Sequence, residues 1–349
     1  MKSFEPDFNN IICAARNIKP ERMPLYEHII SEKVMERITS KKFAELQDGD
    51  ICERKEFFWN YNNFFRDMGY DTVSFERCIG PVMPGSGALG NHKPGAIRDR
   101  ADFDKYPWDE VPDRFFEKYS LDYELMGEAL FPGMKAIGGP GNGVFECVQD
   151  IVGYEKLCYI AVDDPELYDR LFDAVGDLLY KIWQRFLEKF GHFYAVLRFG
   201  DDLGFKTSTL ITPDDIEKRI IPHYRKIIKL VHSLGKPFLL HSCGNIFCVM
   251  DKLIDVAKID AKHSNEDQIA TFDVWIKKYG DRIGNFGGVD TDILCQKSEV
   301  EIKEYVGRVI EYSLDAKGFA LGSGNSIPDY VPVEGYLAMV EAARSSRGE

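Results

Sequence analysis

The sequence has no long hydrophobic run, no excess of basic residues and no recognisable export signal. Its 349 residues carry a formal net charge of −13. A partner with a phosphate backbone needs a basic surface, so we expect no nucleic-acid partner. No stretch approaches the roughly 20 apolar residues of a membrane span, so no membrane partner is expected. Residues 1–7 lack the apolar core of a signal peptide, which predicts a cytoplasmic protein.

Two further sequence patterns are missing. The eight cysteines contain no C-x-x-C pair and form no regular framework. In a long chain without an export signal, such cysteines are expected to be free thiols or metal ligands rather than disulfides. The glycine run at 138–143 does not fit G-x-G-x-x-G cleanly, and no G-K-[ST] follows it, so a nucleotide site is not favoured. The simpler interpretation is a glycine loop that opens a helix carrying Glu146.

Apolar segments and turn residues alternate along most of the chain. Residues 1–65 are expected to be mainly helical, and residues 79–115, rich in glycine and proline, are expected to form a long loop of the kind that is often functional. Seven strands are predicted, at 71–75, 134–137, 194–199, 237–240, 258–262, 282–286 and 318–321. Helices are predicted between and after these strands, because apolar residues recur at helical spacing at 165–190, 213–234, 247–256, 269–279, 299–315 and 333–344.

A strand, a polar or glycine turn and a helix, repeated in this order, indicate a parallel α/β architecture. If one further strand has been missed, the seven predicted strands indicate an eight-stranded (β/α)8 barrel of the TIM type. We therefore expect effectively one domain, in which an N-terminal helical extension over 1–65 packs on a barrel formed by 66–349.

Most of the side chains capable of chemistry come directly after predicted strands. In such a barrel these positions share the C-terminal face, where active sites lie. They are Glu76, Asp201, Asp202, His241, Cys243, His263, Glu266, Asp290 and Ser323.

His241 and Cys243 form the most informative pair. They stand two residues apart where a short apolar strand ends in the turn residues Gly244 and Asn245, so both side chains can point to one place. Imidazole and thiolate are both zinc ligands. An isolated H-x-C triplet is more often a core histidine beside a buried cysteine, but the other strand-end residues favour a metal site. A catalytic zinc needs about three protein ligands; Glu266 is the preferred third, with His263 and Ser323 as alternatives.

The remaining predicted roles concern substrate. Asp201 and Asp202 form an acidic pair suited to general acid–base catalysis if enclosed, although a solvated turn is an equal alternative. Asp290, at another strand end, is grouped with them as catalytic. The predicted substrate-binding residues are Glu76, Glu146, His263 and Ser323.

Several stretches resemble the uroporphyrinogen decarboxylase superfamily over nearly the whole chain. They are PLYEH at 24–28, DLG at 202–204, PFLLHSCG at 237–244, GGVD at 287–290, and ALGSG at 320–324 followed by IPD at 327–329. The resemblance implies a TIM-type barrel with its site at the C-terminal ends of the strands. It covers two chemistries: decarboxylases with an N-terminal R-Q-A-G-R motif and no metal, and zinc-dependent methyltransferases linked to corrinoids.

This sequence lacks R-Q-A-G-R and has the H-x-C part of the zinc motif at His241 and Cys243. Ser323 stands where the zinc branch has a second cysteine, which argues against a coenzyme M methyltransferase and favours the demethylating branch. The resemblance thus implies zinc as cofactor, and a methyl group moved between a small donor, with methoxylated aromatics among the candidates, and the cobalt of a corrinoid held by a partner protein. The sequence contains no D-x-H-x-x-G motif, so we expect this chain to bind no corrinoid itself.

Two alternatives stay open. The first is a metal-free decarboxylase, which would need a cationic site for carboxylates built from Arg77, Arg98 or Arg198. The second is a non-catalytic barrel that binds a tetrapyrrole or a corrinoid, since fold does not fix function. The glycine-rich loop at 79–95 is a candidate docking surface for the corrinoid protein. The sequence gives no oligomeric state.

Overall fold

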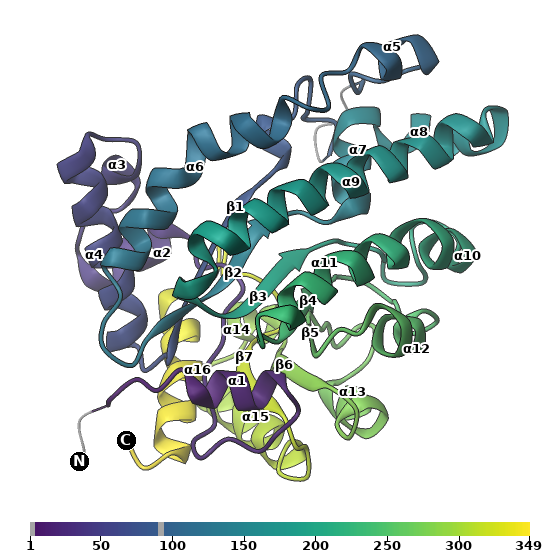
Figure 1. Cartoon of the computed structure of the whole chain (residues 1–349). Helices are drawn as coiled ribbons and strands as arrows, with labels where there is room; N and C mark the ends of the chain where they lie inside the picture. Colours follow the sequence, from purple (N-terminus) through teal and green to yellow (C-terminus); the bar gives the residue numbers. More distant parts are fainter. Residues whose placement is uncertain (1–3, 90–93) are drawn as a thin grey trace.

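The computed structural model describes residues 4–89 and 94–349. Its centre is one sheet of seven parallel strands in the order β1-β2-β3-β4-β5-β6-β7, curled into a half-barrel with helices outside it (Figure 1). All seven predicted strands are present within a few residues of their expected positions. They are β1 (Thr72–Cys78), β2 (Lys135–Gly141), β3 (Tyr194–Gly200), β4 (Phe238–His241), β5 (Ala261–His263), β6 (Gly284–Val289) and β7 (Phe319–Ser323).

The predicted eighth βα unit is not found among the described residues, and an N-terminal segment, residues 24–31, takes its place. Tyr26 N donates to Leu321 O at 2.8 Å and Leu321 N donates to Pro24 O at 3.0 Å, so the segment runs parallel to β7. On its other side, the Ser74 hydroxyl of β1 donates to Glu27 O. The segment therefore lies between β7 and β1. The prediction of a regular (β/α)8 barrel is wrong in this respect.

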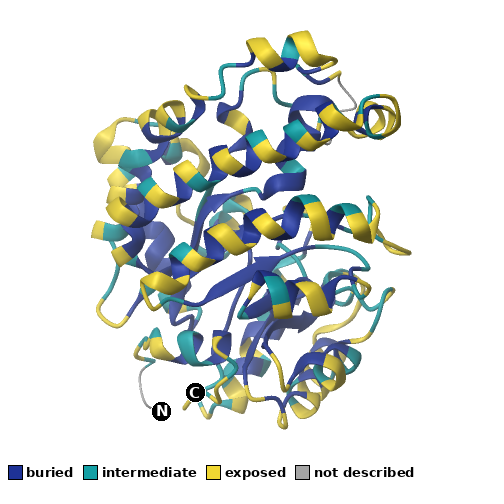
Figure 2. Cartoon of the chain, turned by 45° about the vertical axis from the view of Figure 1, so that its right-hand side comes forward, coloured by how far each residue is buried: buried dark blue, intermediate teal, exposed yellow. Residues whose placement is uncertain are grey.

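The helices turn buried faces toward the sheet and exposed faces toward solvent (Figure 2). The N-terminal helices and those up to β3 are α1 (Asn9–Ala15), α2 (Glu32–Thr39), α3 (Ala44–Gln47), α4 (Ile51–Asp67), η1 (Gly80–Val82), α5 (Arg100–Lys105), α6 (Val111–Glu128), α7 (Val144–Val152), α8 (Tyr154–Asp163), α9 (Pro165–Phe190) and η2 (Gly191–Phe193). Those after β3 are α10 (Pro213–Asp215), η3 (Ile216–Ile220), α11 (Ile221–Ser233), α12 (Met250–Lys252), η4 (Leu253–Ala257), α13 (Phe272–Tyr279), α14 (Thr291–Gln296), α15 (Glu299–Tyr312) and α16 (Val333–Ser346). No described helix has the length and apolarity needed to cross a bilayer.

Helix α9 shows how sequence sets these elements. Asp164 caps its N-terminus by accepting from Leu167 N at 3.1 Å, and Pro165 occupies the first turn, where a missing N–H costs nothing. Apolar residues then recur at helical spacing and are fully buried, among them Leu171, Val175 and Ile182. The same face packs over β2 and β3, so the helix holds the strands that end at the candidate site.

Helix α1 closes the N-terminal end of the barrel. Ile11, Ala14 and Ala15 are fully buried in the inner core. Gly284 and Gly318 stand at the starts of β6 and β7, and a Cβ on either would lie 2.3 Å from the Ala14 carbonyl oxygen. The helix therefore fills this end of the barrel, and a ligand has to enter from the C-terminal ends of the strands.

The expected long loop at 79–115 is more structured than predicted. It contains η1 and α5, and α6 begins within it. Its middle is held by α7: Gly87 N and Leu89 N donate to Asp150 Oδ1 at 2.8 and 3.0 Å, and Ile97 N donates to Ile151 O at 2.9 Å. Residues 90–93 lie outside the described residues, so the candidate docking loop at 79–95 is described only in part.

Candidate metal centre

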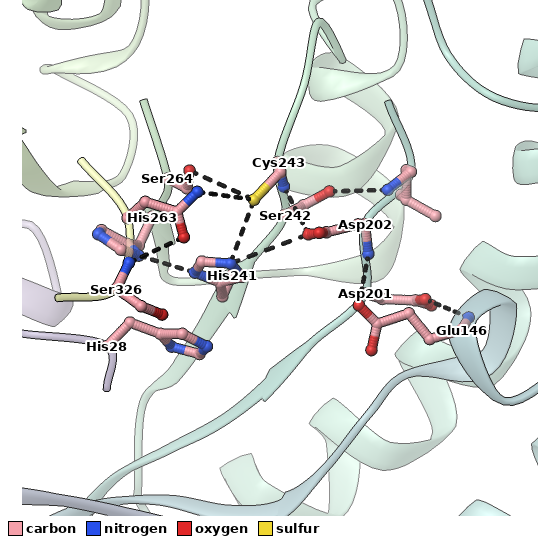
Figure 3. A network of polar contacts seen from close by, with 12 residues as sticks. His28, Glu146, Asp201, Asp202, His241, Ser242, Cys243, His263, Ser264 and Ser326 are labelled. Atoms are coloured by element: carbon pink, nitrogen blue, oxygen red, sulfur yellow. Dashed lines mark hydrogen bonds and ion pairs between the residues drawn. The ribbon is translucent and has the colours of Figure 1, made fainter. Parts of the chain in front are cut away.

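Neighbouring strand ends bring the central histidines together. His241 ends β4 and His263 ends β5, and the two residues are paired in the parallel register. Cys243 follows His241 by two residues, and its backbone N–H donates to Asp202 Oδ1 at 2.8 Å. Asp202 lies two residues beyond the end of β3. Figure 3 shows these side chains facing one another.

Asp202, His241 and Cys243 form a group whose ligand atoms all lie within 4.8 Å of one another. The distance from Cys243 Sγ to His241 Nε2 is 3.4 Å, and the distance from His241 Nε2 to Asp202 Oδ1 is 3.8 Å. Two ligands on a tetrahedral zinc lie about 3.5 Å apart, given Zn–S near 2.3 Å and Zn–N near 2.0 Å. The spacing and the N, S, O donor set thus fit zinc. His241 is buried whereas Cys243 and Asp202 are half-buried, which leaves one side accessible.

Polar groups surround the thiol of Cys243. Asn325 Nδ2 donates to Sγ at 3.4 Å, and the Ser264 hydroxyl lies 3.6 Å from it. Burial, followed by the nearby Asp202 charge, raises the pKa of the Cys243 thiol above its usual range. The metal-free thiol is therefore protonated at neutral pH, and a metal that takes it as thiolate displaces that proton.

A second group, His28, His241 and His263, also has its nitrogen atoms close together. Its geometry does not suit one metal ion. The rings of His28 and His241 are stacked, with centroids 3.7 Å apart and planes at 11°, so their lone pairs lie in parallel planes. His241 Nδ1 and His263 Nδ1 are 2.8 Å apart and share a hydrogen bond. Burial lowers the pKa of all three imidazoles, that of His263 to about 3, so they are neutral.

Both nitrogen atoms of His263 are engaged, because its Nε2 donates to Ser323 O at 2.9 Å. The hydroxyl of Ser323 contacts the buried carboxyl group of Glu27. Both alternative third ligands, His263 and Ser323, are thus engaged in hydrogen bonds of their own. Their predicted roles in substrate binding stay untested.

Asp201 is engaged in holding the fold. Its two oxygen atoms accept from Phe145 N at 3.0 Å, Glu146 N at 2.8 Å and the Tyr224 hydroxyl at 2.6 Å, so it caps the start of α7. Burial raises its pKa to about 6. Asp202, the other half of the predicted acidic pair, belongs instead to the metal group.

Glu146 connects α7 to Asp202. It is half-buried, and its carboxyl group accepts from Asp202 N at 3.3 Å and from Asn142 Nδ2 at 2.8 Å. Burial, together with the charges of Asp201 and Asp202, raises its pKa well above the usual range. The side chain therefore lies beside the metal group, a position compatible with the predicted contact to substrate.

Glu76 is paired inside the barrel rather than free. Its Oε2 lies 2.6 Å from Nη2 of Arg198, which is fully buried. The same guanidinium donates to the Tyr26 hydroxyl at 2.7 Å and to His28 O at 3.0 Å. This ion pair holds β1, β3 and the segment 24–31 together.

Glu266 and Asp290 lie at a neighbouring cavity of about 270 Å³. Both oxygen atoms of Asp290 accept backbone N–H groups, from Asp267 and Asp292 at 2.7 Å each, so it caps α14. Glu266 does not belong to the metal group among the described residues. The cavity is lined mainly by polar side chains: Lys206, Asn265, Glu266, Gln268, Asp290, Thr291, Asp292, Asn325, Ser326, Pro328 and Tyr330.

Sequence reasoning missed several residues around the site. His28 and Glu27 come from a segment that was predicted to belong to a helical extension. Its PLYEH stretch was one of those that resemble the uroporphyrinogen decarboxylase superfamily. Asn325 follows the glycine turn after β7, where a polar residue is unremarkable. Lys262, which precedes His263 in β5, is buried: its Nζ donates to Ser264 O and lies 3.9 Å from the Trp275 ring centroid, and burial lowers its pKa to about 7.

The fold and the site together define a parallel α/β half-barrel with a candidate metal group at the ends of its strands. The family model described as Uroporphyrinogen decarboxylase (URO-D) matches residues 97–346, most of the sequence. The chain belongs to this family. No curated protein matches the sequence.

Solved structures with the same fold include a methyltransferase from Methanosarcina mazei, with a TM-score of 0.73 and 15% identity, covering 98% of this chain and 99% of that chain. A putative vitamin-B12 independent methionine synthase from Listeria monocytogenes has a TM-score of 0.55 and 14% identity, covering 95% and 99%. A B12-independent methionine synthase from Shewanella sp. W3-18-1 has a TM-score of 0.53 and 13% identity, covering 96% of each chain. At these identities the likeness shows the fold alone.

Proposed function

We propose that this protein is a zinc-dependent methyltransferase that moves a methyl group between a small donor and the cobalt of a corrinoid carried by a partner protein. The observation that carries the proposal is the group of Asp202, His241 and Cys243 at the C-terminal ends of the strands. Bound there, zinc would supply Lewis-acid polarisation of the oxygen or sulfur atom that gives up or accepts the methyl group. The fold shared with the Methanosarcina methyltransferase supports this reading.

Asp202 is the third ligand in this proposal, in place of Glu266. Its Oδ1 is 3.8 Å from His241 Nε2 and already accepts the Cys243 N–H, so these three residues would hold one ion together. The accessible side left by the half-buried Asp202 and Cys243 provides the open position that a catalytic zinc keeps.

The residues of the chain orient the substrate in this scheme. Glu146, whose carboxyl group accepts from Asp202 N, can contact a heteroatom at the open position beside Asp202. Asn325 orients the Cys243 sulfur and also lines the neighbouring cavity, which links the two places. Because that cavity is lined mainly by polar groups, a small polar donor fits it better than an apolar arene.

The engaged guanidinium groups count against a decarboxylase that grips carboxylates. Arg198 is fully buried on Glu76. Arg77 pairs with Asp122 at 2.7 Å, and exposed Arg98 pairs with Asp102 at 2.9 Å.

The test is the metal content of protein purified without added metal. We expect about one zinc per chain in the wild type, loss in Cys243→Ala, and a clear loss of affinity in Asp202→Asn, because these residues supply ligand atoms. Glu266→Gln, the matched control at the other candidate carboxylate, should retain the metal. No zinc in the wild type, or loss in Glu266→Gln with retention in Asp202→Asn, contradicts the proposed ligand set. Methyl transfer to cob(I)alamin by the zinc-loaded protein then tests the reaction.

A further inference from the structure

The hydrogen bonds around His263 determine which nitrogen of His241 carries its proton. His263 Nε2 faces the carbonyl oxygen of Ser323 at 2.9 Å. A carbonyl only accepts, so Nε2 must carry a hydrogen. Neutral imidazole has one N–H, which leaves His263 Nδ1 as an acceptor. An additional proton there would place a charge in a fully buried site against two other imidazoles.

The same reasoning extends to His241. Its Nδ1 lies 2.8 Å from the acceptor Nδ1 of His263, so it has to be the donor of that bond. With the proton on Nδ1, the other nitrogen, Nε2, has a free lone pair. That atom faces Cys243 Sγ at 3.4 Å and Asp202 Oδ1 at 3.8 Å.

We propose that His263 is a positioning residue that holds His241 as the Nδ1–H tautomer, so that Nε2 is the nitrogen offered to a metal beside Cys243 and Asp202. This inference rests on the proposed metal site, and it adds a residue that does not touch the metal. In metalloproteins such outer partners fix the tautomer and orientation of a ligating histidine.

The acceptor that anchors this chain of hydrogen bonds is itself held in place. Ser323 N donates to Glu27 Oε1 at 2.9 Å, and the Ser323 hydroxyl contacts both Glu27 and the Asn325 carbonyl oxygen, the latter at 2.5 Å. The carbonyl of Ser323 is thus fixed at the end of β7. Asn325 in turn donates to Cys243 Sγ, so the network returns to the metal group. Ring stacking of His28 on His241 fixes the plane of the imidazole.

Ser323, at the end of β7, thus serves this network through its backbone groups. Its backbone carbonyl sets the tautomer of His263, and through it that of His241. A carboxylate after β3, Asp202, lies where it can serve as the third ligand.

The experiment compares His263→Leu with His263→Asn. Leucine removes the acceptor while filling much of the volume, whereas asparagine keeps an amide oxygen that can accept from His241 Nδ1–H. We expect zinc affinity, measured by chelator competition, to fall about 10- to 100-fold in His263→Leu. It should stay close to wild type in His263→Asn. In a His241→Ala background, His263→Leu should cause no further loss.

A second readout needs no metal. In ¹⁵N-histidine spectra of the metal-free wild type, the resonances that disappear in His241→Ala should show a protonated Nδ1 and an unprotonated Nε2. His241 protonated on Nε2, or unchanged zinc affinity in His263→Leu, overturns the inference. If the wild type binds no zinc yet shows the Nδ1–H tautomer, the metal site of the proposed function is wrong while the tautomer assignment stands. Equal unfolding midpoints of the two metal-free variants exclude a general loss of structure as the cause.

Discussion

Glu27 is a carboxylic acid buried between β7 and β1. Its oxygen atoms face the N–H and the hydroxyl of Ser323, and that hydroxyl also has the Asn325 carbonyl within 2.5 Å. One hydroxyl hydrogen serves one of these two acceptors, so a proton on Glu27 is needed to complete the network. Burial accordingly raises the pKa of Glu27 to about 8.

This pKa predicts how stability depends on pH. Between the ordinary glutamate value of about 4.3 and about 8, the folded protein keeps a proton that the unfolded chain has released. The free energy of unfolding should therefore fall as pH rises through this window, by up to about 1.4 kcal/mol per pH unit from this group. Glu27→Gln, which keeps a donor and an acceptor, should remove this component. Urea unfolding of both proteins from pH 5 to 8 measures it; identical slopes would contradict the assignment.

Proton release on metal binding tests the states of Cys243 and His241. The thiol has a raised pKa and is protonated at pH 7, whereas the lowered pKa of His241 leaves it neutral. Zinc should therefore displace about one proton per chain rather than two. A pH indicator in weakly buffered solution follows the release. Cys243→Ser should release much less, and two protons from the wild type would show that His241 is charged before it binds.

At the scale of elements, contact between α1 and the sheet predicts a costly substitution. Gly284→Ala places a methyl group 2.3 Å from the Ala14 carbonyl oxygen, so α1 or β6 has to move. We expect destabilisation of about 1–3 kcal/mol, as for overpacking in a core. Gly307 is the matched control, because it lies at an exposed position of α15 with open space around it. Gly307→Ala should stabilise by about 0.5–1 kcal/mol. Thermal unfolding distinguishes the two, and a neutral Gly284→Ala would contradict the contact.

The elements that sequence predicted well are those with a strong local signal. Strands β3 and β4 are short, mainly apolar runs with polar residues and glycine after them, and α9 carries an uninterrupted apolar face. The segment 24–31 has no such signal, because it meets β7 through isolated bridges and contains a proline and a buried acid. His241 and Cys243 were found from their spacing within one strand end. The choice between Asp202 and Glu266 as the third ligand depends on how the ends of different strands pack together. The sequence around either residue does not encode that packing.

At the scale of the whole molecule, the half-barrel is completed by residues that precede β1 by more than forty positions. The N-terminal segment supplies Glu27 and His28 to the site, and Tyr26 to the buried Arg198. The site therefore depends on contacts between distant parts of the chain. Folding of the segment onto β7 and β1 and organisation of the metal group should be coupled.

Hydrogen exchange tests this coupling on the intact protein. Tyr26 N and Leu321 N form successive hydrogen bonds between the segment and β7, at 2.8 and 3.0 Å, so both amides should exchange slowly and in the same class. Amides of exposed α5 should exchange much faster. Ser74→Ala removes the hydroxyl that ties Glu27 O to β1, and it should speed exchange over 24–31 while leaving α9 unchanged. If residues 24–31 exchange as fast as α5 in the wild type, the segment is only loosely attached, and it would not fix the positions of His28 and Glu27 at the site.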